Sequence, residues 1–421
     1  MNRKINSMKF YLPNFEDLVD PKYNFLTEEN SPERTNRLLH DWGAHCFYEE
    51  PIFDGVLMSK TIVTRRVDAL IRNAQGVHNY LRLSPNIPVM GDCGAFSYRD
   101  KDQPPYAVDQ ILPYYEELGF TQGVSIDHLI FSSMEQRVRE YRLQITLDNA
   151  RAFLAQHKEQ ACTFTPIGII QGWDAASRRD VARQLLEMGY QHLALGGMVR
   201  SNNAQIVETL QAIHPLICDQ EITLHVFGVA RLGLVPDFMR LGVTSADSTA
   251  PLRRAFLGTN SDNYWTRDGQ KYAAIRVPGT KKRVARRRGV DSTDEVLEKN
   301  HLQIEQLKQM EQQTLNSLRR YDAGDATLED TLETVLAYDR LHGKKRQHEK
   351  PYRRTLEEQP WKQCGCAICE AIGIEVIIFR GNNRNRRRGF HNVKAFYEQL
   401  LNQVTMRWRD LNRKEVRDGA C

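Results

Sequence analysis

Short apolar runs alternate with amphipathic stretches of helical length between about residue 53 and residue 247. This alternation is typical of repeated strand and helix units in a parallel α/β fold. The runs predict seven strands: Gly55–Val63, Ile87–Asp92, Gly123–Asp127, Thr163–Gln171, His192–Gly197, Thr223–Gly228 and Val243–Asp247. A chain of this size has room for an eighth.

Glycines mark three of the junctions between a predicted helix and the strand after it. Gly119, Gly189 and Gly242 each follow an amphipathic stretch and directly precede an aromatic or β-branched residue. Glycine is favoured just after the last turn of a helix, where the backbone often becomes left-handed. These junctions support repeated βα units.

The predicted strands fit a (β/α)8 barrel at least as well as an open, doubly wound sheet. Neither Gly-x-Gly-x-x-Gly nor a Walker A sequence follows any of them, which disfavours the nucleotide-cofactor folds. Polar residues end several strands, as expected where barrel loops build an active site. We therefore expect a TIM barrel with a C-terminal metal-binding subdomain.

Helices dominate the last third of the chain. A capping-box pattern at Ser292 and Glu295 opens one predicted helix, a second covers Thr327–Leu341, and a third covers Asn392–Asp410. We expect an N-terminal extension over 1–52, a catalytic barrel over 53–290, and a helical, zinc-binding region over 291–421 that completes the barrel.

Three cysteines and one histidine cluster near the C-terminus, whereas the other cysteines are scattered singly. Cys364, Cys366, Cys369 and His391 supply the four N/S ligands of a closed, tetrahedral zinc site, which stabilises structure and leaves no open position for chemistry. The alternative is three unrelated cysteines beside a chance histidine. We favour structural zinc.

No apolar run has the length of a signal peptide or of a membrane span, so we expect a cytoplasmic protein with no membrane partner. The net charge is only +5, but basic residues gather in three runs in the last third. The runs cover 281–288, 344–354 and 380–388. They suggest a face that binds phosphates, with solvated loops as the alternative.

Two aspartates lie at predicted strand ends. Asp92 and Asp247 are a candidate carboxylate pair for chemistry at a glycosidic carbon, where one acts as nucleophile and the other as acid or base. Either could instead cap the helix that follows it. Paired carboxylates alone do not decide between these roles.

Ordered motifs add a stronger signal. They are Asp92–Phe96, Gly168–Gly172, Leu195–Met198 and Asp247–Arg253, followed by the Cys-x-Cys-x-x-Cys and histidine cluster. In this order they resemble the tRNA-guanine transglycosylase family, over roughly Asp92 to His391. The resemblance implies a (β/α)8 barrel with a zinc subdomain and a base exchange that leaves the nucleic acid strand intact.

The resemblance also implies residue roles. Asp247 would attack C1′ of a guanosine nucleotide, and Asp92 would carry the proton. Asp127 would accept from the guanine edge, Gln171 and the Gly197 N–H would donate to O6, and Phe96 would stack on the base. Gly196 and Met198 complete the expected base-binding set. Because a stacked base is inaccessible, the nucleotide must be flipped out or presented in a loop.

Departures from the family pattern concern the base. Cys93 stands where the family has serine and Ala95 where it has its second glycine. The segment after Gly197 lacks the acid that accommodates a cationic aminomethyl group, which favours a neutral substituent such as cyano. Arg200 is a candidate donor to it, or a solvated loop residue.

These departures and the basic runs favour the branch of the superfamily that inserts 7-cyano-7-deazaguanine into DNA. The same chemistry on tRNA is the first alternative, since phosphate-binding arginines serve both nucleic acids. A non-catalytic, zinc-containing nucleic-acid-binding subunit is the second. The sequence leaves open whether an accessory protein opens the DNA and whether the chain forms a homodimer.

Overall fold

The computed structural model describes residues 8–257, 261–280, 294–341 and 348–418. Within them the chain divides into two compact units. The first comprises the chain up to Phe15, Phe53–Thr249, and Leu400 onward; the second comprises Glu16–Ile52 and Ala250–Gln399.

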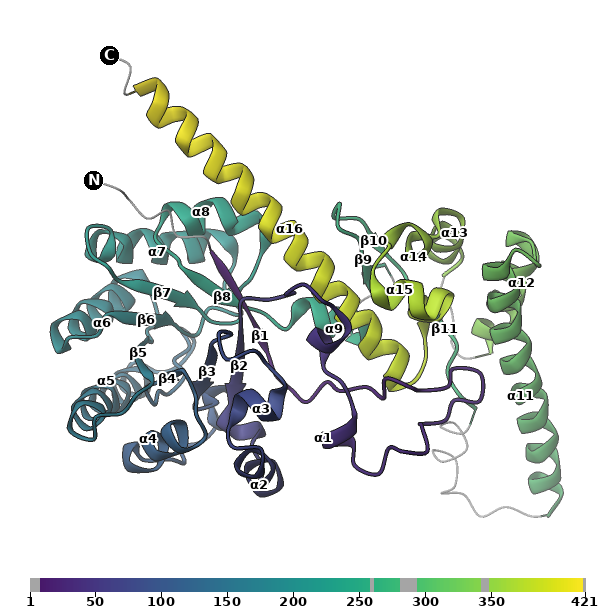
Figure 1. Cartoon of the computed structure of the whole chain (residues 1–421), viewed down its shortest axis with the longest axis horizontal. Helices are drawn as coiled ribbons and strands as arrows, with labels where there is room; N and C mark the ends of the chain where they lie inside the picture. The colour runs from purple at the N-terminus through teal and green to yellow at the C-terminus, as the bar shows by residue number, and fades with distance from the viewer. Residues whose placement is uncertain (1–7, 258–260, 281–293, 342–347, 419–421) are drawn as a thin grey trace. The chain divides into compact units, whose positions relative to one another are not determined.

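A closed barrel of eight parallel strands forms the first unit (Figure 1). The strands are β1 (Lys9–Pro13), β2 (Gly55–Ser59), β3 (Val89–Asp92), β4 (Gln122–Val124), β5 (Thr165–Ile170), β6 (His192–Leu195), β7 (Thr223–Val226) and β8 (Ser245–Asp247). Its helices are α2 (Arg65–Asn73), α3 (Val77–Leu81), α4 (Val108–Glu117), α5 (Gln136–Glu159), α6 (Ala175–Met188), α7 (Asn203–Ile217) and α8 (Val235–Arg240). The predicted barrel fold is confirmed, and each of the seven predicted strands overlaps an observed one.

The eighth strand lies where the sequence predicted an N-terminal extension. β1 pairs in parallel with both β2 and β8, with Tyr11 in register with Gly55 on one side and Asp247 on the other. A Cβ atom at Gly55 would lie 2.4 Å from the Tyr11 ring, so this close approach requires glycine. The barrel therefore begins at Lys9, about forty residues before the expected boundary at 53.

Apolar side chains from successive strands fill the barrel interior. They are Tyr11, Leu57, Met90, Val124, Ile167, Ile169 and Ala194, all nearly inaccessible to solvent. Glycine junctions set the helices against this barrel as predicted: Gly119, Gly189 and Gly242 all have positive φ values. At Gly189 the backbone N–H closes the last turn of α6 on Leu186, and β6 begins three residues later.

The second unit is mainly helical. Its helices are α1 (Arg37–His40), α9 (Ala250–Leu257), α11 (Asp294–Ala323), α12 (Leu328–Arg340), α13 (Glu349–Glu358), α14 (Pro360–Cys364), α15 (Ala367–Ile372) and the first half of α16 (Gly381–Asp418). Two-residue strands form the pairs β9 (Tyr264–Trp265) with β10 (Lys271–Tyr272), and β11 (Ile275–Arg276) with β12 (Ile378–Phe379). The helices α11 and α12 lie side by side (Figure 1).

The structure refines the sequence predictions for this region. The capping residue Ser292 lies outside the described residues. Thr327, where the second helix was expected to begin, caps α12 and accepts from the Asp330 N–H at 3.2 Å. The last helix begins eleven residues before the predicted Asn392. The unit boundaries also differ from those expected at 53 and 291, because Ala250–Thr280 belongs with the helical unit.

None of the helices within the described ranges combines the length and apolar character that crossing a bilayer requires.

Candidate active site and metal centre

The carboxylate of Asp247 is held at the end of β8 by two donors on the same oxygen. The Gly228 N–H donates to Oδ1 at 2.8 Å, and His225 Nε2 lies 3.2 Å from the same atom. Among the described residues no donor binds Oδ2. Asp247 is 4% exposed, so one oxygen is fixed and the other is left for a ligand in a largely water-free setting.

His225 was not predicted as a site residue. It lies on β7, is 3% exposed, and its Nδ1 lies 2.8 Å from Ser245 Oγ. A Ser245 hydroxyl donating to Nδ1 places the ring proton on Nε2, facing Asp247. The one sequence signal for it was a histidine within the otherwise apolar run of β7.

Asp92 lies half-buried at the end of β3. Burial raises its pKa to about 6; the Gly94 N–H and the Ser59 hydroxyl oppose this shift, and the negative charges of Asp127 and Asp247 add to it. The three carboxylates therefore act on one another. Gly94 has φ +75°, and a Cβ there would lie 2.5 Å from Ser59 Oγ, so the turn that donates to Asp92 requires glycine.

Asp127 follows β4, and each of its two carboxylate oxygens accepts a hydrogen bond. Cys93 Sγ donates to Oδ1 at 3.1 Å and Gln171 Nε2 donates to Oδ2 at 2.6 Å. The Tyr98 hydroxyl, 2.9 Å from Cys93 Sγ, donates to the Asp127 carbonyl. Burial raises the pKa of Asp127, and the bonds from Cys93 and Gln171 oppose that rise. The thiol that replaces the family's serine thus orients this carboxylate.

Gln171 lies against the glycine turn that follows β6. A Cβ atom at Gly196 would lie 2.4 Å from Gln171 Nε2, and one at Gly197 would lie 3.0 Å from Oε1. Gly197 also has φ +75°, so both positions exclude other residues. Met198 is fully buried. The predicted base-binding residues of β5 and β6 are therefore in contact.

Two predicted contacts occupy the surface instead. Phe96 is 55% exposed on a 3-10 helix (Ala95–Tyr98), with the Arg99 guanidinium 4.7 Å from its ring centroid, so its face is accessible to a flat ligand. Arg200 is exposed and lies 5.6 Å from the Phe131 ring centroid. This leaves Arg200 on the rim, as its surface alternative predicted.

The cysteine and histidine cluster is assembled in the second unit. Cys364, Cys366 and Cys369 place their sulfur atoms 3.5, 3.4 and 3.4 Å from His391 Nδ1. A tetrahedral zinc ion with Zn–S of about 2.3 Å and Zn–N of about 2.0 Å requires S···N distances of about 3.5 Å. The four ligand atoms therefore fit such an ion, and this group could hold a metal.

Neighbouring side chains orient the metal ligands. His391 Nε2 donates to the Trp265 carbonyl at 2.7 Å, which leaves Nδ1 as the free ligand atom. Tyr264 stacks on the His391 ring at 4.0 Å, and its hydroxyl lies 3.3 Å from Cys369 Sγ. Trp265 and Tyr264 therefore fix the orientation of the His391 ring, as expected around a structural metal ion.

The prediction that the basic run 380–388 binds phosphates is wrong. Arg384 is 1% exposed and pairs with Glu28 and Glu375, and Arg380 pairs with Glu28 and Glu311. Arg388 is fully buried and donates only to backbone carbonyls and Asn385. Arg384 and Arg388, four residues apart, share one inward face of α16, and Arg380 directly precedes this helix. The runs at 281–288 and 344–346 lie outside the described residues.

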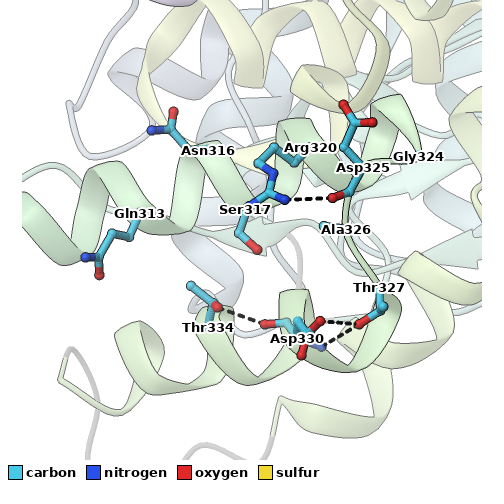
Figure 2. Close-up of a pocket in the computed structure, with 10 residues that line it drawn as sticks. All are labelled: Gln313, Asn316, Ser317, Arg320, Gly324, Asp325, Ala326, Thr327, Asp330 and Thr334. Atoms are coloured by element: carbon cyan, nitrogen blue, oxygen red, sulfur yellow. Dashed lines mark hydrogen bonds between the residues drawn. The ribbon is translucent and has the colours of Figure 1, made fainter.

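A polar pocket in the turn between α11 and α12 contains none of the predicted site residues (Figure 2). Its polar groups bond to one another: Arg320 donates to the Asp325 carbonyl, Thr327 to the Asp330 carboxylate, and Thr334 to the Asp330 carbonyl. These bonds are those of a capped helical turn and point to no chemistry.

The first unit is therefore a closed parallel barrel with three carboxylates, those of Asp92, Asp127 and Asp247, at or just after the ends of its strands. Residues 54–271 match the protein family described as queuine tRNA-ribosyltransferase. Over 427 residues, 96% of this chain and 100% of the relative, the sequence is 39% identical to a DNA-guanine transglycosylase of Salmonella montevideo. The chain belongs to the tRNA-guanine transglycosylase superfamily and is a guanine transglycosylase, a pentosyltransferase.

Proposed function

We propose that this enzyme replaces guanine in DNA by 7-cyano-7-deazaguanine through a covalent ester on Asp247. The observation that supports the proposal is the asymmetric hydrogen bonding of that carboxylate. Both donors bind Oδ1, which leaves Oδ2 to bond to C1′. A nucleophilic carboxylate also stabilises the positive charge that develops at the sugar before the bond forms.

In the first half-reaction Asp247 Oδ2 attacks C1′ and the bond from C1′ to N9 breaks. Protonated Asp92 transfers its proton to the departing guanine, which leaves as a neutral base. The raised pKa of Asp92, about 6, keeps a useful fraction protonated near neutral pH. The phosphodiester backbone stays intact, and the ester on Asp247 occupies C1′ until the incoming base arrives.

In the second half-reaction the incoming base replaces guanine in the same pocket. Its N9–H proton passes to the Asp92 carboxylate as N9 attacks C1′, and the ester bond from C1′ to Asp247 breaks. Asp92 ends protonated and Asp247 ends as a free carboxylate. The cycle therefore balances without another proton donor.

Base recognition uses the cluster around the glycine turn. Asp127 accepts from N1–H and the 2-amino group, since Cys93 and Gln171 hold its two oxygens in place. Gln171 and the Gly197 N–H donate to O6. Gly196 has no side chain to obstruct the base, and the main chain of Met198 lines the same pocket. Phe96 stacks on the base from its exposed position.

We further propose that the ion held by Cys364, Cys366, Cys369 and His391 is zinc. Four protein ligands leave no open position, so the bound ion supplies structure and no reaction step. Its role is to hold the chain segments of α14 and α16 together by binding ligands from both.

DNA is the favoured substrate because the full-length relative is named for it, and tRNA is the second candidate because the family description names it. The test incubates the pure chain with labelled 7-cyano-7-deazaguanine and either duplex DNA or tRNA, with and without proteins that open DNA. Label in DNA supports the proposal. Label in tRNA alone replaces it with the second candidate.

Asp247→Asn tests the covalent step in the same assay. We expect loss of exchange by at least about a thousandfold and no protein–nucleic acid adduct resistant to denaturation. Asp237→Asn is the matched control, because Asp237 is a half-buried carboxylate on α8 that pairs with Arg240, and the change should leave exchange intact. Exchange at the normal rate in Asp247→Asn would exclude the aspartyl ester.

A further inference from the structure

Arg178 breaks the apolar pattern of α6. The buried stripe of this helix consists of Arg178, Val181, Ala182 and Leu185, at the spacing of residues that share one helical face. Arg178 is 7% exposed on that face. An arginine at a core position of an amphipathic helix requires an explanation, because arginine is almost never buried without a partner.

The Arg178 guanidinium has no charge partner among the described residues. Its Nε is buried without a hydrogen-bond acceptor, and no carboxylate of the described chain forms an ion pair with it. Asp174 affects its pKa electrostatically, but the Asp174 carboxylate caps the helix by accepting from the Ser177 N–H at 2.7 Å. Burial lowers the pKa of Arg178, which records the cost of its uncompensated charge.

The free guanidinium lies at the base-binding turn. A Cβ atom at Gly197 would lie 3.8 Å from Arg178 Nη2 and 3.0 Å from Gln171 Oε1, and one at Gly172 would lie 2.8 Å from Arg178 Cγ. Gln171 Oε1 is itself buried without a partner. Two unpartnered, buried polar groups from different elements therefore meet at the backbone that contacts the base.

The position of Arg178 relative to a bound base follows from the purine itself. If Asp127 accepts from N1–H and the 2-amino group, O6 faces Gln171 and Gly197, and position 7 is next to O6 on the same edge. Guanine offers acceptors at O6 and N7, a pair that arginine binds well. A 7-cyano group offers a neutral nitrile nitrogen beyond the same edge, whereas a 7-aminomethyl group carries a positive charge there.

We propose that Arg178 determines which base enters: its guanidinium donates to the O6 and position-7 edge and repels a cationic 7-substituent. This inference rests on the proposed base exchange and names its selectivity residue. Arg178 takes the place of Arg200, one of whose two alternatives from the sequence was a donor role, and which is exposed and lies over Phe131. In a buried site the repulsion between two unscreened positive charges is large, so the discrimination does not depend on shape alone.

The test measures the affinity of the full-length protein for free bases by calorimetry, independently of exchange. The probes are guanine, 7-cyano-7-deazaguanine and 7-aminomethyl-7-deazaguanine. We expect the wild type to bind the cyano base at least tenfold more tightly than the aminomethyl base. Arg178→Met should reduce this ratio by about tenfold or more, mainly by admitting the aminomethyl base.

Arg179→Met is the matched control, because Arg179 is the exposed neighbour on the same helix and should leave the ratio unchanged. If Arg178→Met does not fold, Arg178→Lys decides: the retained charge should still exclude the aminomethyl base, while the lost planar fork weakens cyano binding. Equal wild-type affinities for the two substituted bases, or an unchanged ratio in Arg178→Met, would overturn the inference. Selective binding without exchange into any nucleic acid would overturn the proposed function and leave this inference standing.

Discussion

At the scale of single residues, the candidate site contains three buried or half-buried ionisable side chains whose charged forms destabilise the fold. Asp92 and Asp127 are both carboxyl groups whose pKa is raised, chiefly by burial, and Arg178 is a buried cation without a counter-charge. None of these groups stabilises the fold in its present state. Apolar residues at such positions would carry no such cost, which makes these three groups candidates for a functional role.

Asp92→Asn should raise stability at neutral pH while lowering activity. The pKa of Asp92 rises from 3.8 to about 6 on folding, so the folded state is penalised as pH increases from about 4 to 6 and fully penalised above. Removing the charge should increase the free energy of unfolding by about 1–3 kcal/mol at pH 7.5. Urea denaturation at pH 7.5 and pH 4.5 measures this, and the gain should shrink at the lower pH. A gain of equal size at both pH values would contradict the assignment.

The same substitution tests proton transfer. In the wild type, formation of the covalent adduct requires protonated Asp92, so its rate should fall as pH rises through about 6. Asp92→Asn should form adduct slowly and without this inflection. Rapid-quench measurements of adduct formation between pH 5 and 8 provide the comparison, and an unchanged inflection in the variant would assign it to another group.

His225 should act as a positioning residue for Asp247. His225→Leu removes a donor to the carboxylate, which we expect to lower kcat by about 10- to 100-fold with little change in KM. His225→Gln retains an N–H donor at similar reach and should recover much of the rate. His192→Leu on β6, where His192 contacts Thr223 and not Asp247, is the control expected to leave kcat unchanged. Equal losses in the Gln and Leu variants would indicate a purely structural histidine.

At the scale of elements, the basic run at the start of α16 forms ion pairs inside the second unit. Arg384 on this helix and Arg380 just before it pair with Glu28, Glu311 and Glu375, which come from three separate parts of the second unit. Charge neutralisation inside the unit replaces the expected neutralisation of phosphates. Such a network ties the helix to a specific orientation because each guanidinium has a fixed hydrogen-bonding plane.

Arg384→Met should therefore affect stability rather than DNA binding. Removing one member leaves Glu28 and Glu375 with fewer donors, and we expect a loss of about 3–5 kcal/mol in the free energy of unfolding. Arg353→Met, which breaks an exposed pair with Glu329, should cause little change. Denaturation curves and the salt dependence of DNA affinity separate the two roles. A reduced salt dependence with normal stability would restore the phosphate-binding prediction.

At the scale of the whole molecule, the two units hold different kinds of chemistry. The barrel unit contains every residue proposed to act on the base or sugar, whereas the metal ligands all belong to the helical unit. A structural ion contributes to folding directly, because its ligands meet only in the folded chain. Loss of the ion should therefore lower the stability of the fold before it lowers the exchange activity.

Cys366→Ser tests the metal centre. We expect about one zinc per chain in the wild type by elemental analysis, loss of that zinc in the variant, and a lower melting temperature. Cys218→Ser, at an exposed cysteine outside the cluster, should retain the metal. Full exchange activity and unchanged melting in metal-free protein would count against a structural role.

Much of this protein was determined by local sequence. Alternating apolar runs and glycine junctions predicted seven of the eight strands, because each βα unit is set by periodicity and by left-handed turns within a few residues. The cysteine and histidine cluster was predictable because its three cysteines lie within six positions, and the candidate carboxylates because they lie at or just after strand ends. β1 escaped detection because it is a five-residue strand far in sequence from β8, its closing partner.

Only the tertiary structure decided which charged residues face inward. The basic run in α16 and the arginine in α6 look alike in sequence, yet one is neutralised by carboxylates from distant segments and the other has none. His225 likewise acquires its role from Asp247 and Ser245 on the neighbouring strand. Electrostatic pairing depends on distances between segments far apart in the chain, and a linear pattern of residues contains no information about those distances.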